Sequence, residues 1–414
     1  MDTASKPRAR RRRSVIIAVV MAVLVLAAVV LVFGHRIARL WGGTDPDAGE
    51  AQPHPRPTWS FYQPPAPLPS RPPGTVIRSE PVAAPSGAHG WRVLYHSRSA
   101  SGADVAVSGT VFVPSGTRPA GGWPVVAWAH GTTGSGDSCA PSTDLQPLRG
   151  IEDGAALLAA GDAIVATDYE GLGTPGPHPY LVGASEAHAV LDSVRAAAAL
   201  PGSGIGRSLV VFGHSEGGHA ALFTGELAAS YAPDLRLLGV AAASPPTDLV
   251  ALARDVTSLD YGGAYLVELA AGYSATDPSA HLAPLMTSRG AGSLHLVEDG
   301  CTDDLVNAYT GQTAQDIFRQ DPRTTPPWST ALKANSTGSL PPSLPVLVMQ
   351  GGSDPIVRAS VTTVAVQRMC AAGDAVDYHL YPKAEHNVVP AAATDLNAWI
   401  AERLRNQATP DTCS

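Results

Sequence analysis

The most constraining feature of this chain is an apolar stretch that runs into a glycine-rich turn built around a serine. Residues 209–218 read LVVFGHSEGG, and an alanine-rich stretch, HAALF, follows at 219–223. The apolar stretch predicts a buried strand, and the alanine-rich stretch predicts a helix. Glycines at 213 and 217 allow strand and helix to approach closely, and so tight a turn forces Ser215 into a strained conformation that lifts its hydroxyl above the sheet. An ordinary glycine-rich connection is the alternative, and the flanking strand and helix argue against it.

Around this turn, short apolar runs alternate with alanine-rich stretches, a rhythm typical of βαβ units. The expected strands are residues 105–113, 125–129, 163–167, 209–212, 237–242, 346–350 and 376–380. The expected helices are residues 151–160, 185–199, 216–229, 360–372 and 391–405. The central strands are continuously apolar, as expected where helices cover both faces of a parallel sheet. The predicted fold class is therefore α/β, with a mostly parallel sheet between two layers of helices.

One interval interrupts this alternation. About 100 residues separate the strand that ends near Ala243 from the strand that begins at Val346, far more than an ordinary connection needs. Tyrosines, a tryptophan and alanine-rich stretches fill the interval. We therefore predict a helical lid subdomain inserted around residues 248–342. Two further βα units are the alternative interpretation.

A serine hydroxyl is a poor nucleophile near neutral pH and needs a general base, together with a group that orients the base. In the α/β-hydrolase fold, which the serine turn indicates, the acid and then the histidine follow the serine along the chain. The strand from Val346 ends in GGSDP at 351–355, which supplies Asp354. The loop YPKAEHN at 381–387, after the last expected strand, supplies His386. Ser215, Asp354 and His386 are therefore the expected catalytic residues.

Other residues compete for these roles. Asp248 also follows a strand, but Asp354 ends the penultimate strand, where this fold places the acid. Glu385 adjoins His386 and would point away from it in an extended loop. His214 and His219 flank the serine and cannot easily reach its hydroxyl, so we expect them to support the structure.

Backbone N–H groups are expected to bind the negative oxygen that forms during acyl transfer. Glu216, at the start of the helix after the serine, should supply one of them. The second should come from the loop after an earlier strand, AHGTTG at 129–134, where Gly131 and Thr132 are the candidates.

A further segment, DYEGLGTPGPHPY at 168–180, also follows a strand and so lies at the edge of the sheet where open α/β proteins bind ligands. Tyr169 and His178 are candidates for lining a pocket there, although a structural role is the stronger expectation. The chain has no phosphate-binding loop, dinucleotide fingerprint or HExxH motif. We therefore expect no cofactor and no metal.

The first 73 residues differ in composition from the rest. Val15–Phe33 is a run of 19 uncharged apolar residues preceded by six Lys and Arg, which predicts a transmembrane signal-anchor within residues 1–40 and a body outside the cell. A cleaved signal peptide, which would give a secreted protein, is the alternative. Nine prolines between residues 53 and 73 predict a semi-rigid spacer over 41–73. The catalytic domain would then span 74–414.

Charge and cysteine content limit which partners the chain can bind and in which cellular compartment it works. Eight of the 28 Lys and Arg fall in residues 1–40, which leaves a strongly acidic body and argues against nucleic acid as a partner. The four cysteines are not spaced like metal ligands or a redox pair. In an exported chain an even number of cysteines indicates two disulfides, with three connectivities open.

Three segments together resemble the secretory lipase family, which includes fungal lipases of the lipase A type. They are GHSEGG at 213–218, DYEGLG with HPYLVG at 168–183, and GGSDPIV at 351–357, and the likeness runs from about residue 74 to the C-terminus. The resemblance implies the catalytic roles of Ser215, Asp354 and His386, oxyanion donors at Gly131 and Glu216, and a helical lid. It also implies two disulfides, Cys139–Cys301 and Cys370–Cys413. Fungal members often carry an acidic residue at the first donor position, where this chain has His130-Gly131.

We therefore expect a serine carboxylic-ester hydrolase that cleaves acylglycerols or other acyl esters, of lipids or of small molecules, through an acyl-enzyme. A serine peptidase or amidase on the same fold is the alternative. A non-catalytic envelope binding protein is a third interpretation, and the complete Ser, Asp and His set argues against it. The oligomeric state is not predicted.

Overall fold

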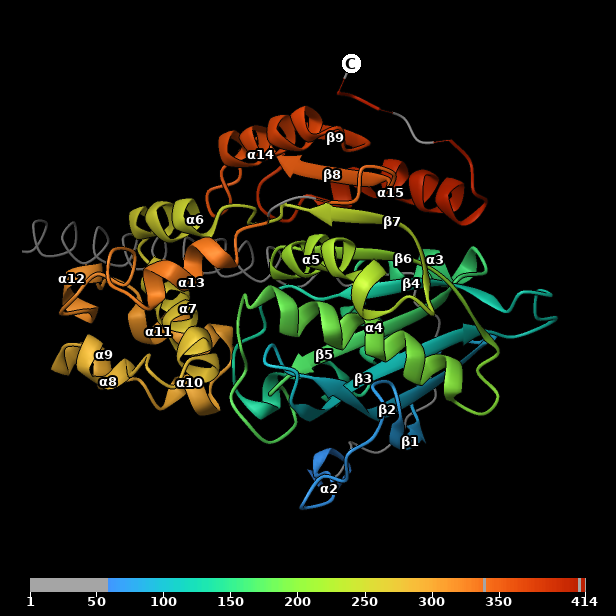
Figure 1. The fold of residues 1–414 in the computed structure, drawn as a ribbon, viewed down its shortest axis with the longest axis horizontal. Helices are drawn as coiled ribbons and strands as arrows, with labels where there is room; N and C mark the ends of the chain where they lie inside the picture. Colours follow the sequence, from blue (N-terminus) through green and yellow to red (C-terminus); the bar gives the residue numbers. More distant parts are fainter. Residues whose placement is uncertain (1–58, 338–339, 409–410, 414) are drawn as a thin grey trace, which may run out of the picture. The chain divides into compact units, whose positions relative to one another are not determined.

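A computed structural model describes residues 59–337, 340–408 and 411–413, all of which belong to one compact unit. Its centre is a nine-stranded sheet with the order β1-β2-β3-β5-β4-β6-β7-β8-β9 (Figure 1). The strands are β1 (Val76–Pro81), β2 (Ala88–Arg98), β3 (Asp104–Pro114), β4 (Trp123–Ala129), β5 (Ala163–Glu170), β6 (Ile205–His214), β7 (Arg236–Ala243), β8 (Val346–Gly351) and β9 (Val376–Tyr381). The neighbouring strands β1, β2, β3 and β5 pair antiparallel. The strands β5, β4, β6, β7, β8 and β9, in that order across the sheet, pair in parallel. The predicted mostly parallel sheet of an α/β-hydrolase is confirmed, and β1 and β2 were not predicted.

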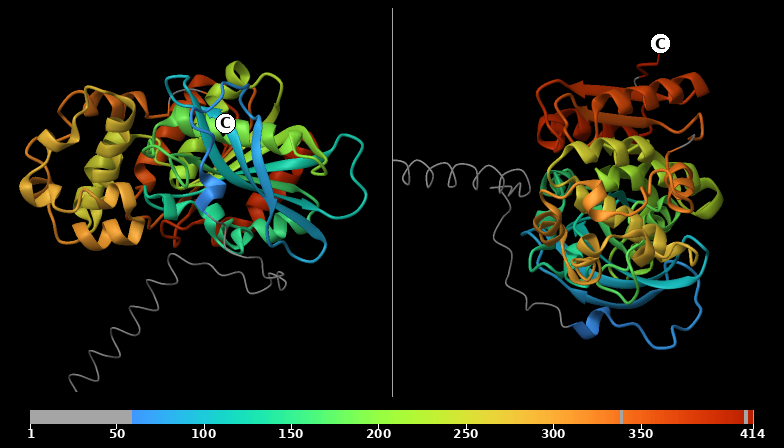
Figure 2. Two further views of the ribbon diagram at one scale, coloured as in Figure 1. Left: turned by 90° about the horizontal axis from the view of Figure 1, so that it is seen from below. Right: turned by 90° about the vertical axis from the view of Figure 1, so that its left-hand side faces the viewer.

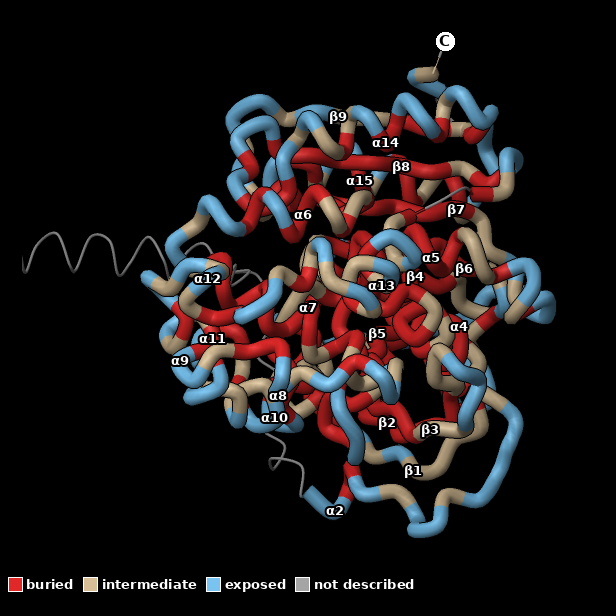
Figure 3. Tube along the Cα trace, turned by 60° about the vertical axis from the view of Figure 1, so that its left-hand side comes forward, coloured by how far each residue is buried: buried red, intermediate tan, exposed pale blue. Residues whose placement is uncertain are grey.

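Helices cover both faces of this sheet. α4 (Gly183–Ala199), α5 (Glu216–Tyr231) and α14 (Ala359–Ala372) contribute to one apolar core, whereas α3 (Gly154–Ala159) and α15 (Val389–Leu404) contribute to the other. Successive residues of β4 alternate between the two cores, because side chains along a strand point to opposite faces. The central strands are accordingly buried along almost their whole length (Figure 3).

The interval between β7 and β8 is helical, as predicted. It contains α6 (Leu249–Asp255), a 3-10 turn η4 (Val256–Ser258), α7 (Gly262–Thr276), α8 (Leu282–Leu285), α9 (Ser288–Ala291), α10 (Leu296–Asp299), α11 (Thr302–Tyr309), α12 (Ala314–Ile317) and α13 (Trp328–Ala334). The described residues of this interval form no strand beyond isolated bridges, so the alternative of two βα units is wrong. These helices group beside the ends of the parallel strands (Figures 1 and 2). Their apolar core includes Tyr180–Val182 and Ile356–Val357, from loops of the sheet domain.

Two disulfides join distant segments, with the pairing that the resemblance implies. Cys139 lies in η1 (Asp137–Cys139), the first of three 3-10 turns after β4, and is bonded to Cys301 at the start of α11. The other turns are η2 (Pro141–Thr143) and η3 (Pro147–Gly150). Cys370 of α14 is bonded to Cys413 near the C-terminus. The first disulfide therefore ties the lid to the loop that follows β4.

The packed body already includes Phe61 and Tyr62, so it begins before the predicted domain boundary at Gly74. Residues 59–62 form the short helix α2 (Trp59–Tyr62). Phe61 and Tyr62 are buried against Leu94 of β2 and Ala106 of β3. The Tyr62 hydroxyl also shares a hydrogen bond of 2.9 Å with Ser142 Oγ. Aromatic side chains thus give this proline-rich segment a core contact that its composition does not suggest.

The predicted anchor, Val15–Phe33, lies outside the described residues. Within the part of the chain that the structure describes, every helix is too short or too polar to cross a bilayer.

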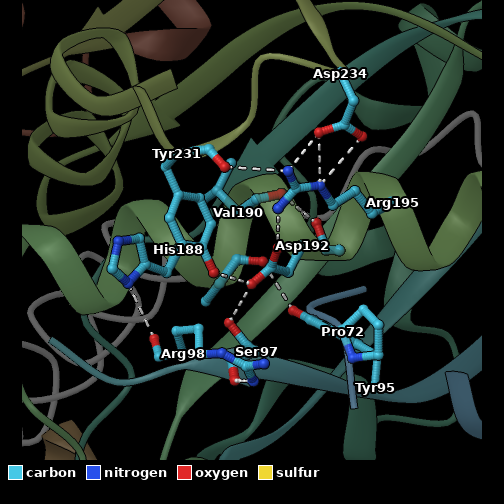
Figure 4. Close-up of polar contacts among 12 residues, drawn as sticks. Pro72, Tyr95, Ser97, Arg98, His188, Val190, Asp192, Arg195, Tyr231 and Asp234 are labelled. Carbon is cyan, nitrogen blue, oxygen red and sulfur yellow. Dashed lines mark hydrogen bonds and ion pairs between the residues drawn. The ribbon is translucent and has the colours of Figure 1, made fainter. Parts of the chain in front are cut away.

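A buried polar cluster fixes α4 against its neighbours (Figure 4). The Asp192 side chain of α4 is fully buried and accepts hydrogen bonds from Ser97 Oγ of β2 at 2.8 Å and the Tyr231 hydroxyl of α5 at 2.7 Å. Arg195, one turn along α4, donates to Asp192 at 2.9 Å and also pairs with Asp234. Burial raises the pKa of Asp192, and these donors offset part of that cost. The cluster therefore joins α4 to β2 and to the C-terminal end of α5.

Phe61→Ala is expected to lower the free energy of unfolding by about 3 kcal/mol, because it leaves a cavity in the core beneath α2. Trp59→Ala should change the free energy of unfolding by less than about 0.5 kcal/mol, because the Trp59 side chain is 53% exposed. Urea unfolding followed by circular dichroism measures both. Equal effects of the two substitutions would show that α2 is not docked in solution.

Candidate active site

Ser215 lies at the junction of β6 and α5, in a backbone conformation that side chains rarely adopt. Its φ is 58° and its ψ is −121°. A Cβ atom on Gly213 would come within 2.0 Å of the Gly217 carbonyl oxygen, and one on Gly217 would come within 1.8 Å of the Ala129 carbonyl oxygen. Glycine is therefore required at both positions. The Ser215 N–H also donates a hydrogen bond of 2.9 Å to the Ala243 carbonyl of β7. The turn presents the serine hydroxyl at the carboxyl edge of the sheet.

His386 lies between Ser215 and Asp354. Its Nε2 is 2.8 Å from Ser215 Oγ, and its Nδ1 is 2.8 Å from Asp354 Oδ2. The three side chains come from the ends of β6 and β8 and from the loop after β9. The structure thus brings together the three residues that the sequence predicts as nucleophile, acid and base.

The Asp354 carboxylate is buried and accepts a full set of hydrogen bonds. Its Oδ1 accepts the N–H groups of Ile356 and Val357 at 2.9 Å each, and its Oδ2 accepts Gln350 Nε2 at 3.1 Å in addition to His386. Burial opposes the ionised form, but His386 and these donors together lower the pKa of Asp354. An ionised acceptor therefore faces Nδ1 and fixes the orientation of the imidazole.

The loop that carries His386 is bonded to the turn that carries Asp354. The Gly352 N–H donates to the Tyr381 carbonyl at 2.8 Å, and the Ser353 N–H donates to the Ala384 carbonyl at 2.9 Å. These two backbone bonds set the distance between acid and base without using either side chain.

The predicted oxyanion donors lie around Ser215. A Cβ atom on Gly131 would be 3.6 Å from the Ser215 Cβ, so the loop after β4 passes directly beside the serine. Glu216 is the first residue of α5, where N–H groups have no partner within the helix. Within the described part of the chain, no acceptor takes a hydrogen bond from the backbone N–H of Gly131, Thr132 or Glu216. The Thr132 hydroxyl is bonded to the Tyr180 hydroxyl at 2.9 Å.

Tyr169 and His178 pack behind this loop. The Tyr169 hydroxyl donates to the His130 carbonyl at 3.0 Å, and its ring lies 4.4 Å from that of His130. His178 Nδ1 donates to the Glu170 carbonyl, and its Nε2 is 3.1 Å from Glu216 Oε1. Both residues are buried and support the loop and Glu216. Their role in lining a pocket stays a prediction.

The residues that competed for catalytic roles lie elsewhere or serve other contacts. Asp248 precedes α6 and caps it, with Oδ1 accepting the Ala251 N–H at 2.9 Å. Glu385 is exposed. His219 Nδ1 is 2.7 Å from Glu186 Oε2, and its Nε2 donates to the carbonyl of Asn335, just after lid helix α13. His214 contacts the backbone of His386 rather than the serine hydroxyl.

Known proteins resemble this chain over most of its length. The family model described as secretory lipase matches residues 154–412. The chain belongs to the secretory lipase family. A Mycobacterium tuberculosis protein named as a probable inactive lipase is 28% identical over 85% of this chain and 83% of its own length. Lipase A of Arthroderma benhamiae is 26% identical over 83% and 78% of the two chains.

Among solved structures, lipase A of Candida antarctica superposes with a TM-score of 0.74 at 20% identity, over 85% of this chain and 87% of that chain. That likeness shows the shared α/β-hydrolase fold. Family membership and the lipase relatives support a lipase or esterase type of hydrolase as the coarse functional class.

Two lid residues that the sequence did not assign to the site have raised pKa values. Burial, with a further contribution from the charge of Asp354, raises the pKa of Tyr261. Glu268 of α7 is buried, and its Oε1 accepts Ser135 Oγ at 3.4 Å. Burial, with a further contribution from the charge of Glu216, raises the pKa of Glu268 to about 8. Nothing local in the sequence marks Glu268, because its partner is 133 residues away.

Glu268→Gln should make stability less dependent on pH. Glu268 binds its proton more tightly in the folded chain, so its contribution to stability is complete below its ordinary pKa of 4.5 and is lost as pH rises through about 8. A glutamine stays neutral, so between about pH 5 and about pH 9 the variant should lose less stability than the wild type, by an amount on the order of 2–4 kcal/mol. Chemical unfolding at each pH measures the free energy of unfolding of both proteins. Glu298→Gln, at an exposed position of the lid, is the matched control. Parallel curves for Glu268→Gln and wild type would contradict a protonated Glu268.

Proposed function

We propose that this secretory lipase is an active serine carboxylic-ester hydrolase that uses Ser215, His386 and Asp354. The observation that carries the proposal is the continuous hydrogen-bonded chain from Ser215 Oγ through both nitrogens of His386 to Asp354, at 2.8 Å for each bond. An ionised Asp354 accepts the hydrogen on Nδ1, so Nε2 of the neutral ring carries the lone pair that faces the serine.

In the first half-reaction His386 Nε2 takes the Ser215 proton as Oγ attacks the ester carbonyl. The carbonyl oxygen becomes negative and is bound by backbone N–H groups of the Gly131–Thr132 loop and of Glu216, with a contribution of about 3 kcal/mol per donor. The protonated His386 then passes its proton to the departing alcohol and leaves an acyl-enzyme. Water repeats the sequence, with His386 as its base, and releases the acid.

The substrate class proposed is lipid or other acyl esters. The lid beside the strand ends has a continuous apolar core against which the partly buried Tyr261 packs, and such apolar surroundings suit an acyl chain. The name of the Mycobacterium tuberculosis relative describes that protein as inactive. In this chain Ser215, His386 and Asp354 are joined by hydrogen bonds, which supports activity.

Ser215→Ala should abolish hydrolysis of p-nitrophenyl esters and labelling by a fluorophosphonate probe, because Ser215 carries the hydroxyl that, among the described residues, is hydrogen-bonded to His386 Nε2. A panel of esters from acetate to stearate, with matched p-nitroanilides, measures the chain-length preference and separates an esterase from an amidase. Full labelling of the variant would refute the assignment of the nucleophile. Faster cleavage of the anilides would favour the amidase alternative.

We also propose that the hydrolase works outside the cytoplasm, held to the membrane by residues 15–33. The support is the apolar run behind six basic residues, the two disulfides, and relatives such as the secreted triacylglycerol lipase of Malassezia globosa.

After expression in a bacterial host, the full chain is expected in the membrane pellet after an alkaline carbonate wash and to be degraded by protease added to spheroplasts. Recovery in the culture medium with a new N-terminus after residue 33 would instead indicate a cleaved signal peptide.

A further inference from the structure

Hydrogen bonds fix the backbone of His386 as well as its ring. Its carbonyl oxygen accepts hydrogen bonds from His214 Nε2 at 3.0 Å, from Ser244 Oγ at 2.8 Å and from the Val388 N–H at 2.9 Å. His214 is the residue immediately before the nucleophile, and Ser244 immediately follows β7. The catalytic base is therefore fastened directly to the turn that carries the serine.

The hydrogen on His214 Nε2 is required by its partner, because a carbonyl oxygen can only accept. The other nitrogen, Nδ1, is 2.9 Å from Glu152 Oε1. An ionised carboxylate also only accepts, so the ring that satisfies both contacts is the doubly protonated imidazolium. Burial opposes this charge, but the charge and hydrogen bond of Glu152, the carbonyl of His386 and the charge of Asp354 together raise the pKa of His214.

Glu152 is well placed to keep this state. It lies in the turn before α3, 62 residues from His214 in the chain, and its side chain is 27% exposed, compared with 10% for His214. The rings of His214 and His386 lie 5.1 Å apart at an angle of 42°, so the two imidazoles do not stack. Glu152 is thus hydrogen-bonded to His214, and His214 to the His386 carbonyl. This series of contacts ends on His386, the residue that lies between Asp354 and Ser215.

We propose that Glu152 and His214 form a second acid–imidazole pair that positions the catalytic base, by holding the His386 backbone at a fixed distance from Ser215. The proposal rests on the proposed function, because it assigns a role within that reaction. His214 is a positioning residue: its contact is with the backbone of His386, and it takes no proton from the substrate. Asp354 fixes the orientation of the His386 imidazole, whereas His214 fixes the position of the His386 backbone.

The test compares kcat, KM and stability for His214→Phe and His214→Gln. Phenylalanine fills the space without a donor, and glutamine places an amide N–H close to the position of Nε2. We expect kcat to fall about 10- to 100-fold in His214→Phe, with KM within about twofold of wild type, because displacing a catalytic group by an ångström has effects of this size. His214→Gln should recover most of the lost kcat.

His96→Phe is the matched control. His96 is buried and paired with Asp104 at 2.9 Å, but lies on β2, away from Ser215. It should lose stability as His214→Phe does and keep the wild-type kcat. Glu152→Leu should lower kcat in the same direction, and the double substitution with His214→Phe should cost no more than His214→Phe alone, because the pair acts as one unit.

Three results would overturn the proposal: a wild-type kcat in His214→Phe, equal losses in His214→Phe and His214→Gln, or additive losses in the double variant. Each is read against turnover of the same ester by the wild-type enzyme. An inactive wild type would refute the proposed function instead, so the two failures are distinguishable.

Discussion

The close approach of Gly213, Gly217 and Ala129 around a strained Ser215 is the constraint on which the site depends. A Cβ atom at Gly213 or Gly217 would overlap a carbonyl oxygen, so the turn requires glycine at both positions. Once it forms, one short segment supplies the proposed nucleophile, the first N–H group of α5 and, through His214, a contact to the backbone of His386. The strain at φ 58° is sustained by the packing of β6 between two buried cores and of α5 in one of them.

The other catalytic groups are brought to this turn mainly through backbone bonds. Ser215 N–H is bound to β7, Ser244 N–H is bound to the Met349 carbonyl of β8, and the turn after β8 is bound to the His386 loop. Each bond joins the end of one parallel strand to the next. The geometry of the triad therefore follows from the sheet register, and side-chain bonds such as Gln350 to Asp354 refine it.

The same logic explains what could be predicted from sequence. Glycine turns after apolar runs mark strand ends, and strand ends of a parallel sheet meet at one edge, so Ser215, Asp354 and His386 could be named in advance. β2 was missed because Arg92, His96 and Ser97 are buried within it and break the apolar pattern. Proline density predicts a spacer, and the sequence alone did not decide whether Phe61 and Tyr62 dock on the domain or on the bilayer surface. Glu152 and Glu268 carry no local signal, since only folding brings their partners to them.

The lid and the oxyanion loop behave as one structural unit on one side of the site. The Thr302 N–H of α11 donates to the Thr133 carbonyl at 3.0 Å, Gly134 forms an isolated bridge with Cys301, and the Cys139–Cys301 disulfide closes the same junction. A movement that lifted α11 from the sheet would pull residues 131–134 with it and displace the N–H groups of Gly131 and Thr132, which we propose as oxyanion donors. Opening of the lid that preserves catalysis must therefore leave α11 in place and use helices that lack such ties to this loop.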